Sequence, residues 1–356
     1  MRTKSLVESV SRSVPRGRAL AARASQARPG LAGRWLRSAL LQRLRGMEWG
    51  LVTLRDPAGE VHLGRGGVDA PRVRVEVLDP SFWADVALGG SVGAGESYVA
   101  GRWRCDDLPG LVRILVRNRS VLDGMERGRA RRAAPLLKLA HRLRDNSRDG
   151  SRRNIAGHYD LGNDLYALFL DPTMMYSCAV FEHEGQDLHA AQLAKLERIC
   201  RKLDLRPEDH LLEIGTGWGA MAVHAATRYG CRVTTTTISR EQHALAVERV
   251  RAAGVADRVT VLLEDYRELT GRYDKLVSIE MIEAVGEAHL DTYFRRCSEL
   301  LEPHGAMLLQ VITMQDQFYD QMRRNVDFIQ RHVFPGSHLP SVGAIAECVA
   351  RCTDMR

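Results

Sequence analysis

The feature that most constrains the fold is a glycine-rich stretch in the second half of the chain. Residues 212–220 read LEIGTGWGA, with Gly215, Gly217 and Gly219 at alternate positions. The apolar residues around Glu213 predict a strand, and the alanine-rich sequence after the last glycine predicts a helix. Glycines between a strand and a helix predict a tight turn, whose backbone N–H groups and helix N-terminus can face a ligand. A glycine-rich turn without a ligand is the alternative.

The sequence on both sides of this turn alternates between β-rich runs and helical patterns. Helices are expected over 188–203, 240–253 and 290–301, and strands over 231–238, 259–263, 275–279 and 306–312. Such alternation predicts an α/β fold with a parallel sheet covered by helices on both faces. Ligands of these sheets bind at the carboxyl ends of the strands. The polar runs that begin at Thr237, Asp265 and Glu280 all fall at those ends.

The first part of the chain has a different pattern. Short β-rich runs at 49–54, 61–63 and 73–78 and helical patterns at 81–88 and 107–118 predict a small α+β domain without a catalytic constellation. We therefore divide the chain into four parts. They are a basic, largely disordered extension (1–46) that contains an amphipathic helix, the small α+β domain (47–126), a basic linker (127–153), and the parallel-sheet domain (154–356), whose first segment, 154–181, is expected to cover a substrate or cofactor.

Charge is distributed unevenly along the sequence. Residues 1–153 hold 30 Lys and Arg against 15 Asp and Glu, whereas residues 154–356 hold 21 against 29, so the two parts carry +15 and −8. A basic part of this kind suits an anionic membrane surface or a nucleic acid, although a solvated arginine-rich surface explains it equally well. The amphipathic helix expected over 31–44 could lie on a membrane or pack on the next domain.

Composition restricts the compartment. The sequence has no apolar run of membrane-spanning length and no apolar signal segment, so we expect a cytoplasmic protein. Seven scattered cysteines show neither paired spacing nor a CxxC motif, which is typical of a reducing compartment and predicts no metal site.

Several runs, taken together, identify a family. HYDLGNDLY, MMYSCAVF, LEIGTGWGA, TISREQ, EDYREL, VSIEMIEAVG, LLQVIT and DFIQRHVFPGSHLPS cover nearly all of residues 154–342. In this order they closely resemble the cyclopropane-fatty-acyl-phospholipid synthase family of S-adenosylmethionine-dependent enzymes. Residues 47–146 also resemble that family's N-terminal domain. The resemblance implies a Rossmann-like methyltransferase sheet.

The resemblance also implies a set of cofactor-binding residues. Each has a structural alternative, since threonines suit any strand, Tyr266 could belong to the core and Gln242 could lie on a helix surface. The implied set holds the methionine part with Gly215, Gly217 and Gly219, closes over it with Tyr176 and Ser177, holds the ribose with Thr237, Ile238, Ser239 and Gln242, and holds adenine with Asp265 and Tyr266.

The implied chemistry is methyl transfer to a cis double bond of an unsaturated phospholipid acyl chain. Attack by an alkene leaves a carbocation, and ring closure then requires a base. In this family the base is a bicarbonate ion. Glu283 matches its glutamate ligand, Cys178 matches a pocket cysteine, and Gln310 stands where the best-known members have histidine. The implied protein contacts the inner membrane surface peripherally, needs no nucleic acid, and could form a homodimer.

The resemblance ends before the family's sequence does. The family continues past the position of Arg356 with further strands and with a tyrosine and a cysteine of its active site. We therefore expect an incomplete sheet, weak or absent turnover and a tendency to aggregate. Two alternatives to a cyclopropane product remain open, a methyl-branched or methylene-bearing fatty acid and an inactive membrane-binding fragment.

Overall fold

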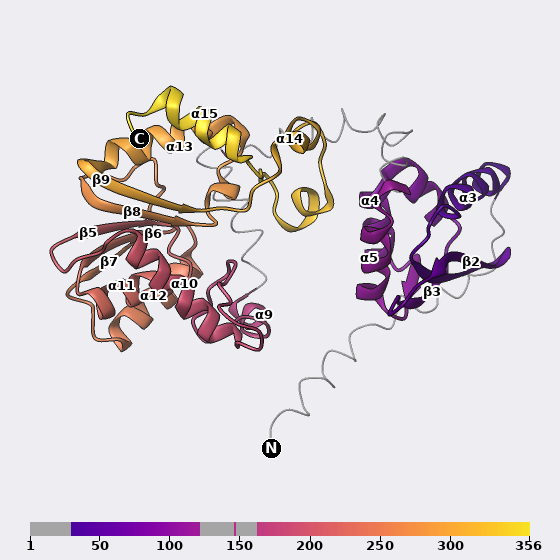
Figure 1. The fold of residues 1–356 in the computed structure, drawn as a ribbon, viewed down its shortest axis with the longest axis horizontal. Coiled ribbons are helices and arrows are strands. Elements are labelled where there is room, and N and C mark those ends of the chain that lie inside the picture. Colours follow the sequence, from indigo (N-terminus) through magenta and orange to yellow (C-terminus); the bar gives the residue numbers. More distant parts are fainter. Residues whose placement is uncertain (1–29, 122–145, 147–161) are drawn as a thin grey trace, which may run out of the picture. The chain divides into compact units, whose positions relative to one another are not determined.

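A computed structural model describes residues 30–121, 146 and 162–356. The chain divides into an N-terminal unit, residues 1–137, and a C-terminal unit, residues 138–356, each described here by itself (Figure 1). The expected disorder of the first 29 residues, most of the expected linker and the start of the expected covering segment lie outside the described residues.

The N-terminal unit is built on a four-stranded mixed sheet. Its strand order is β2-β1-β3-β4, with antiparallel outer pairs and a parallel central pair. The strands are β1 (Gly50–Asp56), β2 (Gly59–Gly66), β3 (Arg72–Val77) and β4 (Trp103–Cys105). Val73, Val75 and Val77 alternate into the core, as period-two burial requires. The sheet and its helices form the predicted small α+β fold.

The described part of this unit, residues 30–121, also contains the helices α3 (Leu31–Leu44), α4 (Phe82–Val99) and α5 (Leu108–Arg117). Leu40 and Leu41 of α3 are buried in the core of the unit. Arg37 on the same helix pairs with the buried carboxylate of Asp56, with 2.5 Å between Nε and Oδ2. The amphipathic stripe therefore packs on the domain, which was one of the two expectations for this helix.

Helix α4 is longer than predicted. The expected helix stopped at Leu88, before the run GGSVGAG, because glycine lowers helical propensity. In the structure Gly90 adopts a φ of 57° and kinks the helix, which then continues to Val99. At Gly93 a Cβ atom would lie 2.0 Å from the carbonyl oxygen of Asp85. Glycine at this position therefore permits the close contact across the kink.

The C-terminal unit is organised around five parallel strands, as the sequence predicted. Their order is β7-β6-β5-β8-β9. The strands are β5 (His210–Ile214), β6 (Arg232–Thr236), β7 (Val259–Leu262), β8 (Tyr273–Ile279) and β9 (Leu301–Gln310). Strand β9 begins five residues before its predicted start and contains Pro303, which an edge strand tolerates.

Helices cover both faces of this sheet (Figure 1). Leu211 faces a core shared with α10 (Leu188–Lys202), α11 (Ala220–Tyr229) and α12 (Arg240–Ala252). The next residue, Leu212, faces a second core with α13 (Leu290–Leu300) and α15 (Val342–Cys352). Short elements complete the unit: α9 (Asn163–Ala167), η2 (Ile282–Ala284), η3 (Glu287–His289), α14 (Asp316–Met322) and η4 (Ile329–Val333). None of the helices in the described residues has the length and apolar character needed to cross a membrane.

Candidate active site

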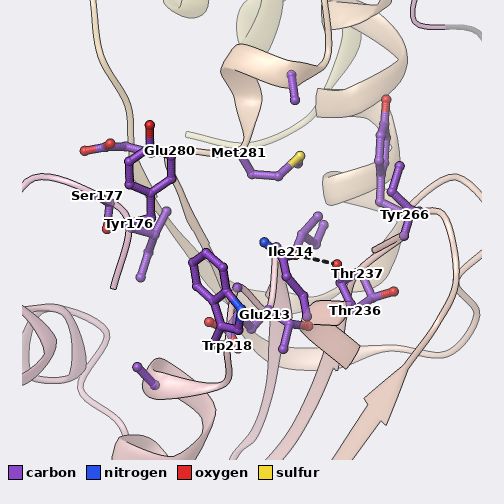
Figure 2. Close-up of a pocket in the computed structure, with 18 of the residues that line it drawn as sticks. Tyr176, Ser177, Glu213, Ile214, Trp218, Thr236, Thr237, Tyr266, Glu280 and Met281 are labelled. Atoms are coloured by element: carbon purple, nitrogen blue, oxygen red, sulfur yellow. Dashed lines mark hydrogen bonds between the residues drawn. The ribbon is translucent and has the colours of Figure 1, made fainter. Parts of the chain in front are cut away.

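A cavity opens at the carboxyl ends of β5, β6 and β8, where ligands of parallel sheets bind. It is lined by the glycine loop, by residues 174–177 and by the turns that follow the strands. Figure 2 shows Tyr176 and Trp218 across this cavity from Tyr266. Nine of the eleven predicted cofactor residues line it: Tyr176, Ser177, Gly215, Gly217, Thr237, Ile238, Gln242, Asp265 and Tyr266.

The three glycines of the loop have different surroundings. All have positive φ, 103° at Gly215, 51° at Gly217 and 90° at Gly219. A Cβ atom at Gly217 would have no neighbour within 4 Å, whereas one at Gly219 would lie 3.2 Å from Cβ of Ala246. Gly217 therefore borders open space in the cavity. Gly219 does not line the cavity, and instead starts helix α11 and allows it to pack closely on α12.

The predicted ribose-binding residues form a small hydrogen-bonded group after β6. The Thr237 hydroxyl donates to Oε1 of Gln242 at 2.8 Å, and both side chains are buried at the cavity wall. Ser239 does not line the cavity. Its Oγ accepts from the backbone N–H of Gln242 and caps the N-terminus of α12. Ser239 thus positions the helix that carries Gln242.

The predicted adenine-binding residues lie after β7. The Asp265 carboxylate is nearly buried and makes an ion pair with Arg267, with Nη2–Oδ2 and Nε–Oδ1 distances of 2.6 and 2.8 Å. Burial raises the pKa of the Tyr266 phenol well above its usual value, so the ring stays neutral. The Tyr266 ring also packs edge-on against Tyr293, with centroids 5.4 Å apart. This wall offers a flat, fixed aromatic surface.

Glu213 places a carboxyl group beneath the glycine loop. The side chain lines the cavity yet is only 2% exposed. Its Oε2 accepts from the Thr235 hydroxyl at 2.7 Å, and the Thr235 hydroxyl lies 2.7 Å from that of Thr216. Burial raises the pKa of Glu213 to about 8, so the group is largely protonated at neutral pH. A cationic group in the cavity would favour its ionised form.

An aromatic cluster forms the opposite wall. The Tyr166 ring lies 5.2 Å from Tyr176 and 5.1 Å from Trp218, and Phe169 lies 6.1 Å from Tyr176. The Trp218 indole N–H donates to Oδ1 of Asn163 at 2.8 Å, which ties the loop to α9. Tyr176 and Phe169 are half exposed, so an apolar surface leads into the cavity.

A buried lysine supports the segment that covers the cavity. Nζ of Lys195 donates to Oγ of Ser177 at 2.6 Å, and Nε2 of Gln192 donates to the Ser177 carbonyl at 2.9 Å. Burial lowers the pKa of Lys195 to about 8, although the charge of Glu280 nearby acts in the opposite direction. Sequence reasoning missed this lysine: it shares a helix face with the buried Ala191 and Ile199, but lysine is seldom buried.

The predicted catalytic residues surround the cavity without lining it. Cys178 and Gln310 both bond Glu280, which does line it: the Cys178 N–H and Nε2 of Gln310 each donate to Oε1 of Glu280 at 2.8 Å. Sequence reasoning placed Glu280 at a strand end but gave it no role. The available signal was a carboxylate directly after an apolar strand.

Glu283 lies deeper, within η2. Its Oε1 accepts from the Ile312 N–H at 2.6 Å, while Oε2 is buried without a hydrogen-bond partner in the described part of the chain. Burial raises the pKa of Glu283 to about 7, and the charge of Glu280 acts in the same direction. Among the described residues, no group of three His, Cys, Asp or Glu side chains is placed to bind a metal ion.

Comparison with known proteins accounts for this arrangement. The family model described as mycolic acid cyclopropane synthetase matches residues 146–355, which is more than half of the chain. The chain belongs to the mycolic acid cyclopropane synthetase family. This family consists of S-adenosylmethionine-dependent C-methyltransferases that modify fatty acyl chains, and membership confirms the resemblance found in the sequence.

Two relatives show how far the similarity extends. The tuberculostearic acid methyltransferase UfaA1 of Mycobacterium tuberculosis is 40% identical over 274 residues, which cover 75% of this chain and 64% of the relative. The cyclopropane-fatty-acyl-phospholipid synthase of Escherichia coli strain K12 is 39% identical over 276 residues, covering 77% and 68%. The chain thus spans about two thirds of the length of these family members.

A solved structure shows the same fold. The mycolic acid cyclopropane synthase CmaA1, complexed with SAH and CTAB, superposes with a TM-score of 0.53 at 34% identity, covering 56% of this chain and 73% of that one. The MmaA2 cyclopropane synthase from Mycobacterium tuberculosis gives a TM-score of 0.52 at 32% identity. The sheet of the C-terminal unit is therefore the methyltransferase sheet of this family.

Proposed function

We propose that this chain transfers a one-carbon group from S-adenosylmethionine to the cis double bond of an unsaturated phospholipid acyl chain, giving a cyclopropane fatty acid. The observation that carries the proposal is the cavity at the strand ends, where an open glycine loop, a buried carboxyl group and an aromatic wall meet in a chain of this family. Relatives named for acyl-chain products support the substrate class.

The residues present fit S-adenosylmethionine. The open space at Gly217 and the backbone of the glycine loop suit the methionine part, and the buried Glu213 suits its cationic amino group. Thr237 and Gln242 offer polar atoms for the ribose, and the neutral Tyr266 ring offers a surface for adenine. When bound, the cofactor supplies an electrophilic methyl group that the π electrons of an alkene attack, which leaves a carbocation on the acyl chain.

The protein's own task is to stabilise that positive charge and then accept a proton. Two carboxyl groups are available, Glu280 at the cavity and Glu283 behind it. The aromatic face of Tyr176 can stabilise a cation through its quadrupole. Phe169 and Tyr176 provide an apolar approach for the acyl chain.

A second product class deserves a direct test, because one of the relatives is a tuberculostearic acid methyltransferase. Methyl transfer is shared by both routes, and the outcome depends on which proton leaves the carbocation. A ring and a methylene branch have the same mass, so acyl chains from cis-unsaturated phospholipid vesicles, after incubation with the chain and S-adenosylmethionine, are treated with ozone before mass spectrometry. Ozone cleaves the carbon–carbon double bond of a methylene branch and leaves the ring intact. A saturated methyl branch is heavier by two hydrogens and forms only when a hydride donor is added to the incubation. We expect the cyclopropane. Acyl chains of unchanged mass would reject both routes and favour a binding role.

Peripheral contact with an anionic membrane is part of the same proposal. The substrate is a membrane lipid, and the first 153 residues carry a net charge of +15. Arginines attract lipid phosphates from the membrane surface without any spanning helix.

A further inference from the structure

Glu280 is held in a backbone conformation that non-glycine residues seldom adopt. Its φ is 48°, directly after β8 ends at Ile279. Its N–H donates to the carbonyl oxygen of Gln310 at 2.8 Å, which fixes this conformation against the neighbouring strand. Left-handed conformations of this kind persist at functional sites when surrounding contacts maintain them. Glu280 combines such a conformation with a place at the cavity wall.

The carboxylate of Glu280 is also held in place. Its Oε1 accepts from the Cys178 N–H and from Nε2 of Gln310, both at 2.8 Å. Nε2 of Gln310 donates as well to the Cys178 carbonyl at 3.1 Å, so strand β9 and the covering segment meet at this carboxylate. The second oxygen, Oε2, has no hydrogen-bond partner among the described residues and can accept a proton. Figure 2 shows Glu280 on the same side of the cavity as Tyr176 and Ser177.

Bicarbonate does not fit this arrangement. The family resemblance assigned the anion to Cys178, Gln310 and Glu283. Here the Cys178 N–H and the Gln310 amide are engaged by Glu280, and Oε1 of Glu283 is engaged by the Ile312 N–H. An added anion would also meet the negative charge of Glu280 in a site of low dielectric constant.

We infer that Glu280 replaces the bicarbonate ion and is itself the proton acceptor of the reaction, so that this chain needs no added anion. The inference rests on the proposed function. The C–H bond of the transferred methyl group breaks, its electron pair closes the ring onto the cationic carbon, and the proton moves to Oε2 of Glu280. Glu280 then returns the proton to solvent.

Binding of ¹³C-labelled bicarbonate tests this inference without any turnover. The chain saturated with S-adenosylhomocysteine is titrated into labelled bicarbonate, and line broadening of the ¹³C signal reports binding. We expect no binding by the wild type and specific binding by Glu280→Gly. Glycine tolerates the positive φ, and without the Glu280 carboxylate the Cys178 N–H and the Gln310 amide can donate to an anion. Asp204→Gly is the matched control, since Asp204 is an acidic residue with φ 50° outside the cavity. It should behave as wild type.

Turnover gives the second measurement. In bicarbonate-free buffer the wild type should form product at the same rate as with bicarbonate present. Glu280→Gln should be slower by about 100-fold or more, as expected for a lost general base, with unchanged S-adenosylhomocysteine affinity. Bicarbonate bound by the wild type, or full turnover of Glu280→Gln in that buffer, would overturn the inference. If the wild type methylates no lipid at all, the proposed function fails, and the bicarbonate titration still decides whether Glu280 occupies the anion site.

Discussion

Replacing Glu213 by glutamine should stabilise the C-terminal unit at neutral pH. The Glu213 carboxyl group is fully enclosed, and burial raises its pKa from 4.5 to about 8. The folded state therefore binds a proton that the unfolded state releases above pH 4.5. The stability associated with this group is fully present below pH 4.5 and is lost as pH rises through 8. Glutamine resembles the protonated acid in shape and carries no such proton.

Linkage gives the size of the effect. Each unit of pKa difference corresponds to about 1.4 kcal/mol, so the wild type should lose about 3 kcal/mol by pH 7 and about 5 kcal/mol by pH 9, relative to pH 4. The free energy of unfolding of Glu213→Gln should therefore exceed that of the wild type by an amount that grows with pH, to about 3 kcal/mol at pH 7 and about 5 kcal/mol at pH 9. The Thr235 hydroxyl can still donate to the amide oxygen, so the hydrogen bond is retained.

Urea unfolding at pH 5, 7 and 9 measures this difference. Trp218 is the single tryptophan in residues 138–356. The part of the fluorescence change on unfolding that is lost in Trp218→Phe therefore reports the unfolding of the C-terminal unit. Exposed Glu302 provides the control, since Glu302→Gln should follow the wild-type dependence on pH. Parallel stability curves for wild type and Glu213→Gln from pH 5 to 9 would refute the argument from burial.

Three further predictions follow from the site and the charge distribution. Gly217→Val should abolish S-adenosylmethionine binding in calorimetry. Gly254→Val places a side chain at a similarly positive φ of 70° outside the cavity and should keep the binding; equal affinities of the two variants would show that the loop does not bind the cofactor. Lys195→Met should weaken S-adenosylmethionine binding about tenfold, because the hydrogen bond to Ser177 is lost. Lys202→Met, at an exposed lysine, is the control, and an unchanged affinity of Lys195→Met would contradict the role of Lys195 in supporting Ser177. Binding to anionic vesicles should weaken with salt and on deletion of residues 1–29, and stronger binding to duplex DNA would contradict the membrane role. That deletion spares α3, whose leucines belong to the core.

The elements around the glycine loop could be predicted from the sequence because their signals are local. Hydrophobic runs and a change of period lie within a few residues of each other. The roles of the loop glycines could not be separated in that way. Gly219 is distinguished from Gly217 only by the approach of Ala246, which another helix supplies.

The role of Glu280 was equally hidden. Its hydrogen-bond partners lie 102 and 30 positions away in the sequence. Its positive φ could not be predicted either, because glutamate is not a residue that favours this conformation. Similarly, β4 has three residues, too few for a period to show. Long-range pairing, and not propensity, determines these features.

The central claim is that a methyl group passes from S-adenosylmethionine to an acyl double bond at this cavity. The most direct test incubates the chain with methyl-labelled S-adenosylmethionine and two vesicle preparations that differ only in having cis-unsaturated or saturated acyl chains, then locates the label in the extracted phospholipid. We predict that label enters the acyl chains of the unsaturated lipid alone. Label in the lipid headgroup, equal labelling of both preparations, or no labelled lipid would contradict the account.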